Sequence, residues 1–132
     1  MGDWTFKNLR EVEDKAPGFG LAELQSARFA HGELDAEQVG VSLMGVKPGK
    51  RQGFAHRHVN AEEVYVVLSG SGRMKLDDEI IEVGPLDAIR VAPGVLRAFE
   101  ADDDGLELLA FGARHEGDGE IIRDYDWESR QN

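Results

Sequence analysis

Residues 54–70 read Phe-Ala-His-Arg-His-Val-Asn-Ala-Glu-Glu-Val-Tyr-Val-Val-Leu-Ser-Gly, and they say more about the fold than any other part of the chain. The β-branched and aromatic run at residues 64–68 predicts a buried strand. On an extended strand, side chains two residues apart point to the same side, so His56 and His58 would bring two imidazoles together. Two neutral imidazoles on one wall suit a transition metal.

An acidic pair opens the strand that follows the two histidines. Glu62 and Glu63 come shortly after His58, so a tight turn would return one carboxylate to the imidazoles. Successive residues of a strand face opposite sides, and parity across a turn of unknown shape does not choose between the two acids. Two imidazoles and one carboxylate form a ligand set for a divalent transition metal such as Fe, Mn, Zn, Ni or Cu.

Turn-forming residues divide the rest of the chain at short intervals, among them Gly70-Ser71-Gly72 and Asp104-Gly105. The segments between these turns are rich in β-branched and aromatic residues, which favour strands. The predicted strands cover residues 39–46, 62–68, 73–76, 79–83, 86–91, 97–100 and 106–111. We therefore expect an all-β core, and two packed sheets or a closed barrel would protect the edges of so many short strands.

Three segments carry expectations of their own. Residues 73–83 predict a hairpin with its polar tip at Asp77-Asp78. Residues 21–29 fit either a short helix or an edge strand, and the pattern leaves both open. The tail has too much apolar area to stay in water, so we expect it to dock on the barrel or on a partner subunit. Its apolar residues are Ile121, Ile122, Tyr125 and Trp127.

Length and composition predict one acidic globular domain, residues 1–132, with a barrel core at about 39–112. The formal charge of −11 repels phosphate backbones and anionic lipid, which argues against nucleic acid or a membrane as a partner. No apolar run is long enough to span a membrane and the first ten residues lack a signal peptide, so we predict a cytoplasmic location. The chain has no cysteine, and any catalysis must use other groups.

The spacing His56-x-His58-x4-Glu63-x6-Gly70 resembles the first motif of the cupin superfamily, in which the acid corresponds to Glu63. Residues 84–99 resemble the second motif, in which a histidine follows a proline-glycine turn. Together the two motifs and the strands between them cover residues 46–99, about half of the chain. The resemblance implies a cupin barrel, a double-stranded β-helix or jelly roll, which is commonly a homodimer with a small-molecule site at one mouth.

The sequence departs from the family pattern at the fourth metal ligand. Arg97 stands where the second motif has its histidine, and Lys50 replaces a glycine of the strict first motif. A guanidinium stays protonated and has no lone pair for a metal. Three arrangements are open: a metal held by His56, His58 and Glu63 alone, a metal-free pair of Arg97 with Glu63, or an outward Arg97 with another group completing the site.

The resemblance does not fix one reaction, because the family includes several kinds of enzyme and binding proteins. We expect a metal-dependent oxygenase or isomerase of a small carboxylate or enol metabolite, in which Arg97 clamps the anion and Tyr65 offers a hydroxyl. The alternative is a non-catalytic module, with or without a metal, that binds or senses a small ligand. His31 and His115 fall in polar segments and are predicted to be solvated, outside the site.

Overall fold

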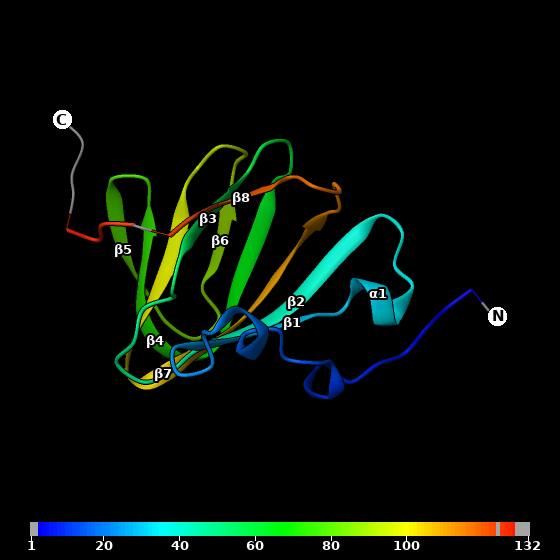
Figure 1. Ribbon diagram of the computed structural model, residues 1–132, viewed down its shortest axis with the longest axis horizontal. Helices are drawn as coiled ribbons and strands as arrows, with labels where there is room; N and C mark the ends of the chain where they lie inside the picture. Colours follow the sequence, from blue (N-terminus) through cyan, green and yellow to red (C-terminus); the bar gives the residue numbers. More distant parts are fainter. Residues whose placement is uncertain (1–2, 124, 129–132) are drawn as a thin grey trace.

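The structure, a computed structural model, describes residues 3–123 and 125–128 and is drawn in Figure 1. Within this part of the chain, eight strands form one curled antiparallel sheet, so the protein is an all-β jelly-roll barrel as expected. The strands are β1 (Gln25–Phe29), β2 (Val39–Val46), β3 (Ala55–His58), β4 (Glu63–Leu76), β5 (Glu79–Val83), β6 (Ala88–Val91), β7 (Arg97–Ala113) and β8 (Gly119–Ile122).

The helical segments are all short. They are the 3-10 turns η1 (Leu9–Glu11) and η2 (Pro17–Phe19) and the single helical turn α1 (His31–Leu34). None of the helices in the described residues has both the length and the apolar character needed to cross a membrane.

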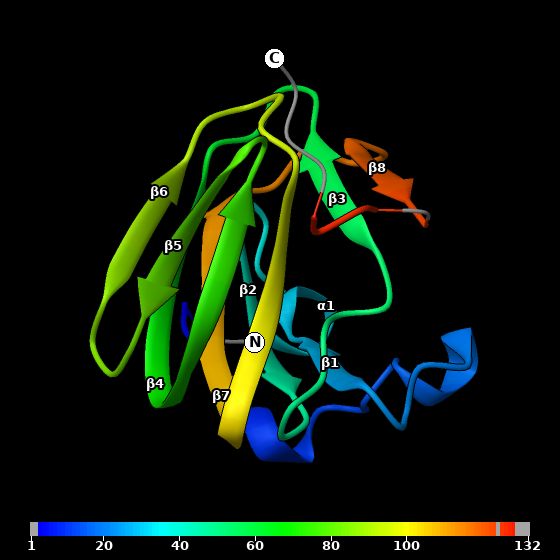
Figure 2. The same ribbon diagram turned by 90° about the vertical axis from the view of Figure 1, so that its left-hand side faces the viewer.

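The sheet curls because β7 pairs with three neighbours that lie on different sides of the interior. One path through the sheet runs β1-β2-β7-β3-β8, and β4 joins it by pairing with β5, β6 and β7. Figure 2 shows β4, β5 and β6 on one side of the molecule and β3 with β8 on the other. The two walls carrying the predicted ligands, β3 and β4, therefore meet through β7.

Two long strands replace four of the short strands expected from the sequence. β4 continues through Gly70 and Gly72, and β7 continues through Gly105. A Cβ on Gly70 would lie 2.0 Å from the Gly105 carbonyl oxygen, and one on Gly72 would lie 1.9 Å from that of Glu100. The prediction of turns at these positions is wrong, because the glycines permit a close crossing and a register shift in the ladder instead.

The strand pairing decides the predictions for residues 73–83, for residues 21–29 and for the tail. The hairpin at residues 73–83 is confirmed, with Leu76 paired with Glu79 and Asp77 in the left-handed region at φ 52°. Residues 25–29 form an edge strand, β1, beside β2. The tail docks on the barrel, because β8 pairs with β3 and Trp127 is buried against Ala55 and Ala98.

The core lies between the two walls of the barrel. Alternate residues of β4 turn inward, and Tyr65, Val67 and Met74 are fully buried there. Phe99 and Leu108 of β7 face them. Because the side-chain period of a strand is two, the same alternation that buries Tyr65 also turns Glu63 inward.

Candidate functional site

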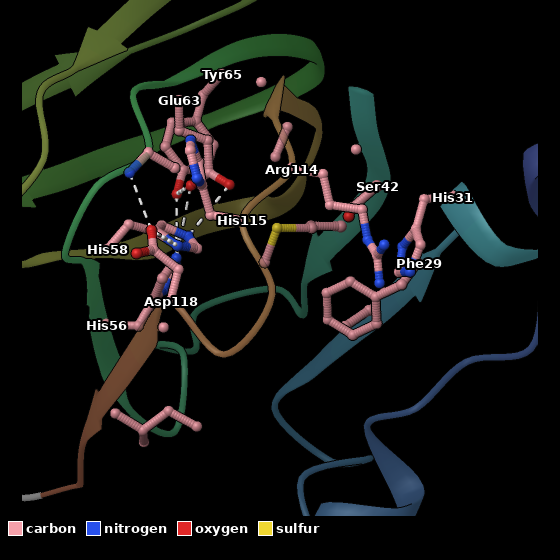
Figure 3. Close-up of a pocket in the computed structure, with 18 of the residues that line it drawn as sticks. Phe29, His31, Ser42, His56, His58, Glu63, Tyr65, Arg114, His115 and Asp118 are labelled. Atoms are coloured by element: carbon pink, nitrogen blue, oxygen red, sulfur yellow. Dashed lines mark hydrogen bonds and ion pairs between the residues drawn. The ribbon is translucent and has the colours of Figure 1, made fainter. Parts of the chain in front are cut away.

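Strands β3 and β4 bring three predicted ligands together, as Figure 3 shows. His56 and His58 extend to the same side of β3, with their ring centroids 5.4 Å apart, while Arg57 pairs with Glu120 at 2.9 Å. The Glu63 Oε1 atom lies 3.6 Å from His56 Nε2, and its Oε2 atom lies 3.4 Å from His58 Nε2.

The strand register decides between the two acids that sequence parity left open. Glu63, Tyr65 and Val67 alternate on the inner face of β4. Glu62 lies outside the donor cluster, is exposed, and pairs with Arg90 Nη1 at 2.9 Å. Glu63 is therefore the acid of the cluster.

The contacts of Glu63 with the two histidines have the spacing that a divalent ion requires. One donor atom from each of the three residues can be chosen so that all lie within 4.8 Å of one another. Ligand atoms held at about 2.1 Å from one ion are at most about 4.2 Å apart, and the contacts of 3.4 and 3.6 Å satisfy this limit. Two imidazoles and a carboxylate also match the chemistry of Zn, Fe, Mn, Ni and Cu sites, so the residues fit a transition metal.

Glu63 is held in the ionised form. Burial alone raises the pKa of a carboxyl group, but hydrogen bonds with His56, His58 and Tyr65 outweigh it and keep the pKa of Glu63 well below its usual range. The Tyr65 hydroxyl donates to Glu63 Oε1 and its oxygen lies 3.3 Å from His56 Nε2. The cluster thus contains a carboxylate anion, which is the form that binds a cation.

The neighbouring groups respond differently to the same surroundings. Burial lowers the pKa of His56, whereas the hydrogen bond with Glu63 raises the pKa of His58. Burial also raises the pKa of Tyr65 well above its ordinary value. At neutral pH Tyr65 therefore keeps its proton and His56 is a neutral ring with a lone pair.

Asp118 is a site residue that the sequence analysis missed. It lies just before β8, is 6% exposed, and places Oδ2 at 3.5 Å from His58 Nδ1. The same carboxylate accepts hydrogen bonds from the backbone N–H groups of Asn60 and Ala61, at 2.9 Å each. It thereby anchors the β3–β4 turn and lies beside His58, but no local pattern in its acidic, glycine-rich segment marks this role.

Beside the cluster is a cavity of about 470 Å³. His56, His58, Glu63 and Tyr65 line one part of it. Its other walls are largely apolar, and they include Phe54. The cavity is large enough for a small organic ligand in contact with the cluster.

Arg97 faces the interior, which excludes the outward arrangement. It is fully buried, and its Nη1 lies 3.8 Å from Glu63 Oε1. Its Nη2 donates weakly to the Ala92 carbonyl at 3.4 Å, and Nε and Nη1 have no hydrogen-bond partner in the described part of the chain. The residues that line the cavity do not include Arg97. The guanidinium thus approaches the cluster from behind, where its charge opposes a bound cation.

Two histidines that the sequence analysis set outside the site line the same cavity. His115 is exposed, as predicted, whereas His31, at the start of α1, is partly buried. Neither belongs to the donor cluster. The sequence does not show that these two histidines line the cavity, because the cavity is formed by segments far apart along the chain.

Comparisons with known proteins agree with the observed fold. A family model described as Cupin domain matches residues 42–111. A cupin protein from Bacteroides fragilis has a similar structure, with 23% identity, a TM-score of 0.69, and coverage of 98% of this chain and 100% of that chain. No curated protein matches the sequence.

Two further solved structures have the same fold at low identity. The polyketide cyclase RemF from Streptomyces resistomycificus is 20% identical, with a TM-score of 0.71, over 93% of this chain and 87% of that chain. Oxalate decarboxylase from Bacillus subtilis is 23% identical, with a TM-score of 0.72, over 91% of this chain but 32% of that chain.

Proposed function

Because this chain belongs to the Cupin domain family, whose model matches more than half of it, we propose that it is a metal-dependent enzyme acting on a small organic molecule. The observation that carries the proposal is the convergence of His56, His58 and Glu63 beside a ligand-sized cavity. A donor set of this composition leaves coordination positions open for water or substrate.

The names of two structural neighbours support the choice of an enzyme that acts on small molecules. One is a polyketide cyclase and the other an oxalate decarboxylase. Because one fold can host many reactions, these names support the class of activity but not a particular substrate. As expected from the sequence, we propose an oxygenase or an isomerase as the type of enzyme.

The proposed chemistry divides between the ion and the chain. A divalent ion held by His56, His58 and Glu63 supplies polarisation of a substrate oxygen or, for a redox-active metal, activation of dioxygen. Tyr65 orients the Glu63 carboxylate through its hydroxyl proton and lines the cavity beside it. Asp118 restrains the His58 ring, and the apolar walls exclude water from the ligand.

Metal titration of the chelator-stripped protein tests the proposal. Wild-type protein should bind one equivalent of Co²⁺ or Zn²⁺ per chain, measured by calorimetry and by the visible absorption of Co²⁺. His56→Ala and Glu63→Gln should each weaken binding by about 100-fold or more, because each removes a ligand. His115→Ala is the matched control, since it removes a histidine of the same cavity that lies outside the donor cluster.

Wild-type protein that binds no metal, or variants that bind as tightly as wild type, would contradict the metal site. The first result would favour a second candidate, a metal-free binding or sensing module. A specific observation supports that candidate: the Tyr65 hydroxyl already donates to Glu63, and Arg97 lies 3.8 Å from the same carboxylate oxygen. In that case ligand binding without turnover is expected.

A further inference from the structure

A second arginine, Arg114, faces the cavity that Arg97 does not reach. It follows directly on the last residue of β7, and its backbone N–H donates to the Gln38 carbonyl at 2.9 Å, which fixes the main chain beside β2. Its side chain lines the cavity. The two arginines therefore flank β7 at its opposite ends. Arg97, its first residue, lies behind the donor cluster, and Arg114, the residue after its last, lines the cavity.

The guanidinium of Arg114 belongs to a distinct end of the cavity. Figure 3 shows it pointing toward His31 and Phe29, away from the end that holds His56, His58 and Glu63. His31 and Phe29 line the same cavity. These residues come from the end of β1, the start of α1 and the end of β7, so the grouping exists only in the folded chain.

The charge at this end is available to a ligand. In the described part of the chain, the side chains of Arg114 and His31 form no ion pair or hydrogen bond with another residue. The acids of the same cavity are already engaged: Glu62 pairs with Arg90, Glu63 interacts with the histidines and Tyr65, and Asp118 accepts from the β3–β4 turn. Glu116 also lines the cavity, but it is exposed and forms no ion pair with Arg114.

We propose that Arg114, with His31 beside it, binds a carboxylate at the far end of an apolar ligand whose other end reaches the His56–His58–Glu63 cluster. A planar guanidinium binds a carboxylate through two parallel hydrogen bonds. One guanidinium offers a single formal charge, which matches a carboxylate better than the double charge of a phosphate monoester. The largely apolar walls between the two ends suit a hydrocarbon or aromatic body.

This assignment changes the role that the sequence analysis gave to Arg97. A buried guanidinium that does not line the cavity cannot clamp a substrate, whereas Arg114 can. The inference rests on the proposed function only in taking this cavity as the ligand site. It names the substrate class, an amphipathic carboxylate, and assigns Arg114 as a specificity-determining residue.

The test uses two probes that differ in charge but not in shape. We would titrate ¹⁵N-labelled, chelator-stripped protein at pH 7 with 4-phenylbutyrate and with its neutral amide, and follow amide resonances. Because the protein is free of metal, the carboxylate cannot gain affinity by coordinating an ion. The carboxylate should bind wild-type protein about tenfold more tightly than the amide, as expected for a charge-assisted pair of hydrogen bonds.

Three variants make the result specific. Arg114→Gln should reduce the preference for the carboxylate to about one, and Arg114→Lys should retain part of it, because lysine keeps the charge but not the planar fork. Arg123→Gln is the matched control: Arg123 is exposed and does not line the cavity, so the preference should stay at the wild-type value. Spectra of each variant report directly whether it is folded.

Equal binding of the two probes to wild-type protein, or an unchanged preference in Arg114→Gln, would overturn the assignment. Tighter binding of 3-phenylpropyl phosphate than of 4-phenylbutyrate would overturn the choice of a carboxylate. Co²⁺ affinity should be the same in Arg114→Gln as in wild type. A protein that shows the Arg114-dependent preference but binds no metal would refute the proposed enzyme and leave this inference standing.

Discussion

Two groups of arginines and carboxylates in the barrel have opposite characters. The first group, the Glu100 network, consists of Glu100, Arg51, Arg73 and Asp102. In it, Arg73 Nε lies 2.6 Å from a Glu100 carboxylate oxygen and Arg73 Nη2 lies 2.9 Å from an Asp102 carboxylate oxygen. Around Glu63, the buried Arg97 remains 3.8 Å away and two of its nitrogen atoms have no hydrogen-bond partner in the described residues.

The two groups differ in whether their own residues provide partners for all of their charges and buried polar atoms. The Glu100 network is partly exposed, and close pairs satisfy its charges, so it serves the fold. The Glu63 cluster is more buried, and its long contacts leave buried polar atoms without partners, which is unfavourable for stability alone. Such incompleteness is typical of a site that binds something else.

Among the residues that surround the three donors of the Glu63 cluster, we expect the largest effect at Asp118. Asp118→Asn removes the negative charge beside His58 Nδ1 and should weaken Co²⁺ binding by about 10- to 100-fold, as is usual for the outer partner of a ligating histidine. Asn60→Ala is the control, because it removes the side-chain donor at 3.0 Å from Asp118 but keeps the charge beside His58. Equal losses in the two variants would assign Asp118 to the turn alone.

A smaller effect, of opposite sign, is expected at Arg97. Arg97→His removes a positive charge near Glu63 and adds a nitrogen lone pair, so Co²⁺ should bind about tenfold more tightly. Arg97→Met removes the charge without adding a ligand and should give a smaller gain. If neither variant changes the affinity measured by calorimetry, the guanidinium does not act on the metal-binding cluster.

The smallest effect concerns stability and its dependence on pH. Burial alone would raise the pKa of Glu100, but hydrogen bonds with Arg51 and Arg73 hold it below its usual value. A carboxyl group with a lowered pKa in the folded state stabilises the protein above the unfolded pKa of about 4.3, and this contribution disappears as the pH falls through the folded-state pKa.

Glu100→Gln should therefore lower the free energy of unfolding by about 1 kcal/mol at pH 7. The difference from wild type should shrink as the pH falls below about 4, measured by urea unfolding. Glu79→Gln, at an exposed position of β5, is the control and should change stability little. A loss at Glu100 that stays constant from pH 7 to pH 3 would rule out the charge as its cause.

Much of the site could be predicted because its central residues are close in sequence. The period of two along a strand turns His56 and His58 to one side, and the motif spacing selects Glu63. Asp118, Arg114 and His31 could not be predicted in this way. Each lies next to the end of a strand that is placed by long-range pairing, and the residues nearby in sequence carry no signal of that pairing.

The sequence by itself determined the all-β class, the alternation within strands and the pairing of His56 with His58, since these follow from local geometry, and the resemblance to cupins selected Glu63 as the third donor. Only the tertiary structure decided that glycines at 70, 72 and 105 lie within long strands rather than at their ends, because that depends on how distant segments of the backbone pair. It also decided that Arg97 is buried behind the cluster while Arg114 faces the ligand cavity. The residue type fixes the charge of a side chain, but the accessibility of that side chain depends on which distant strands pack against it.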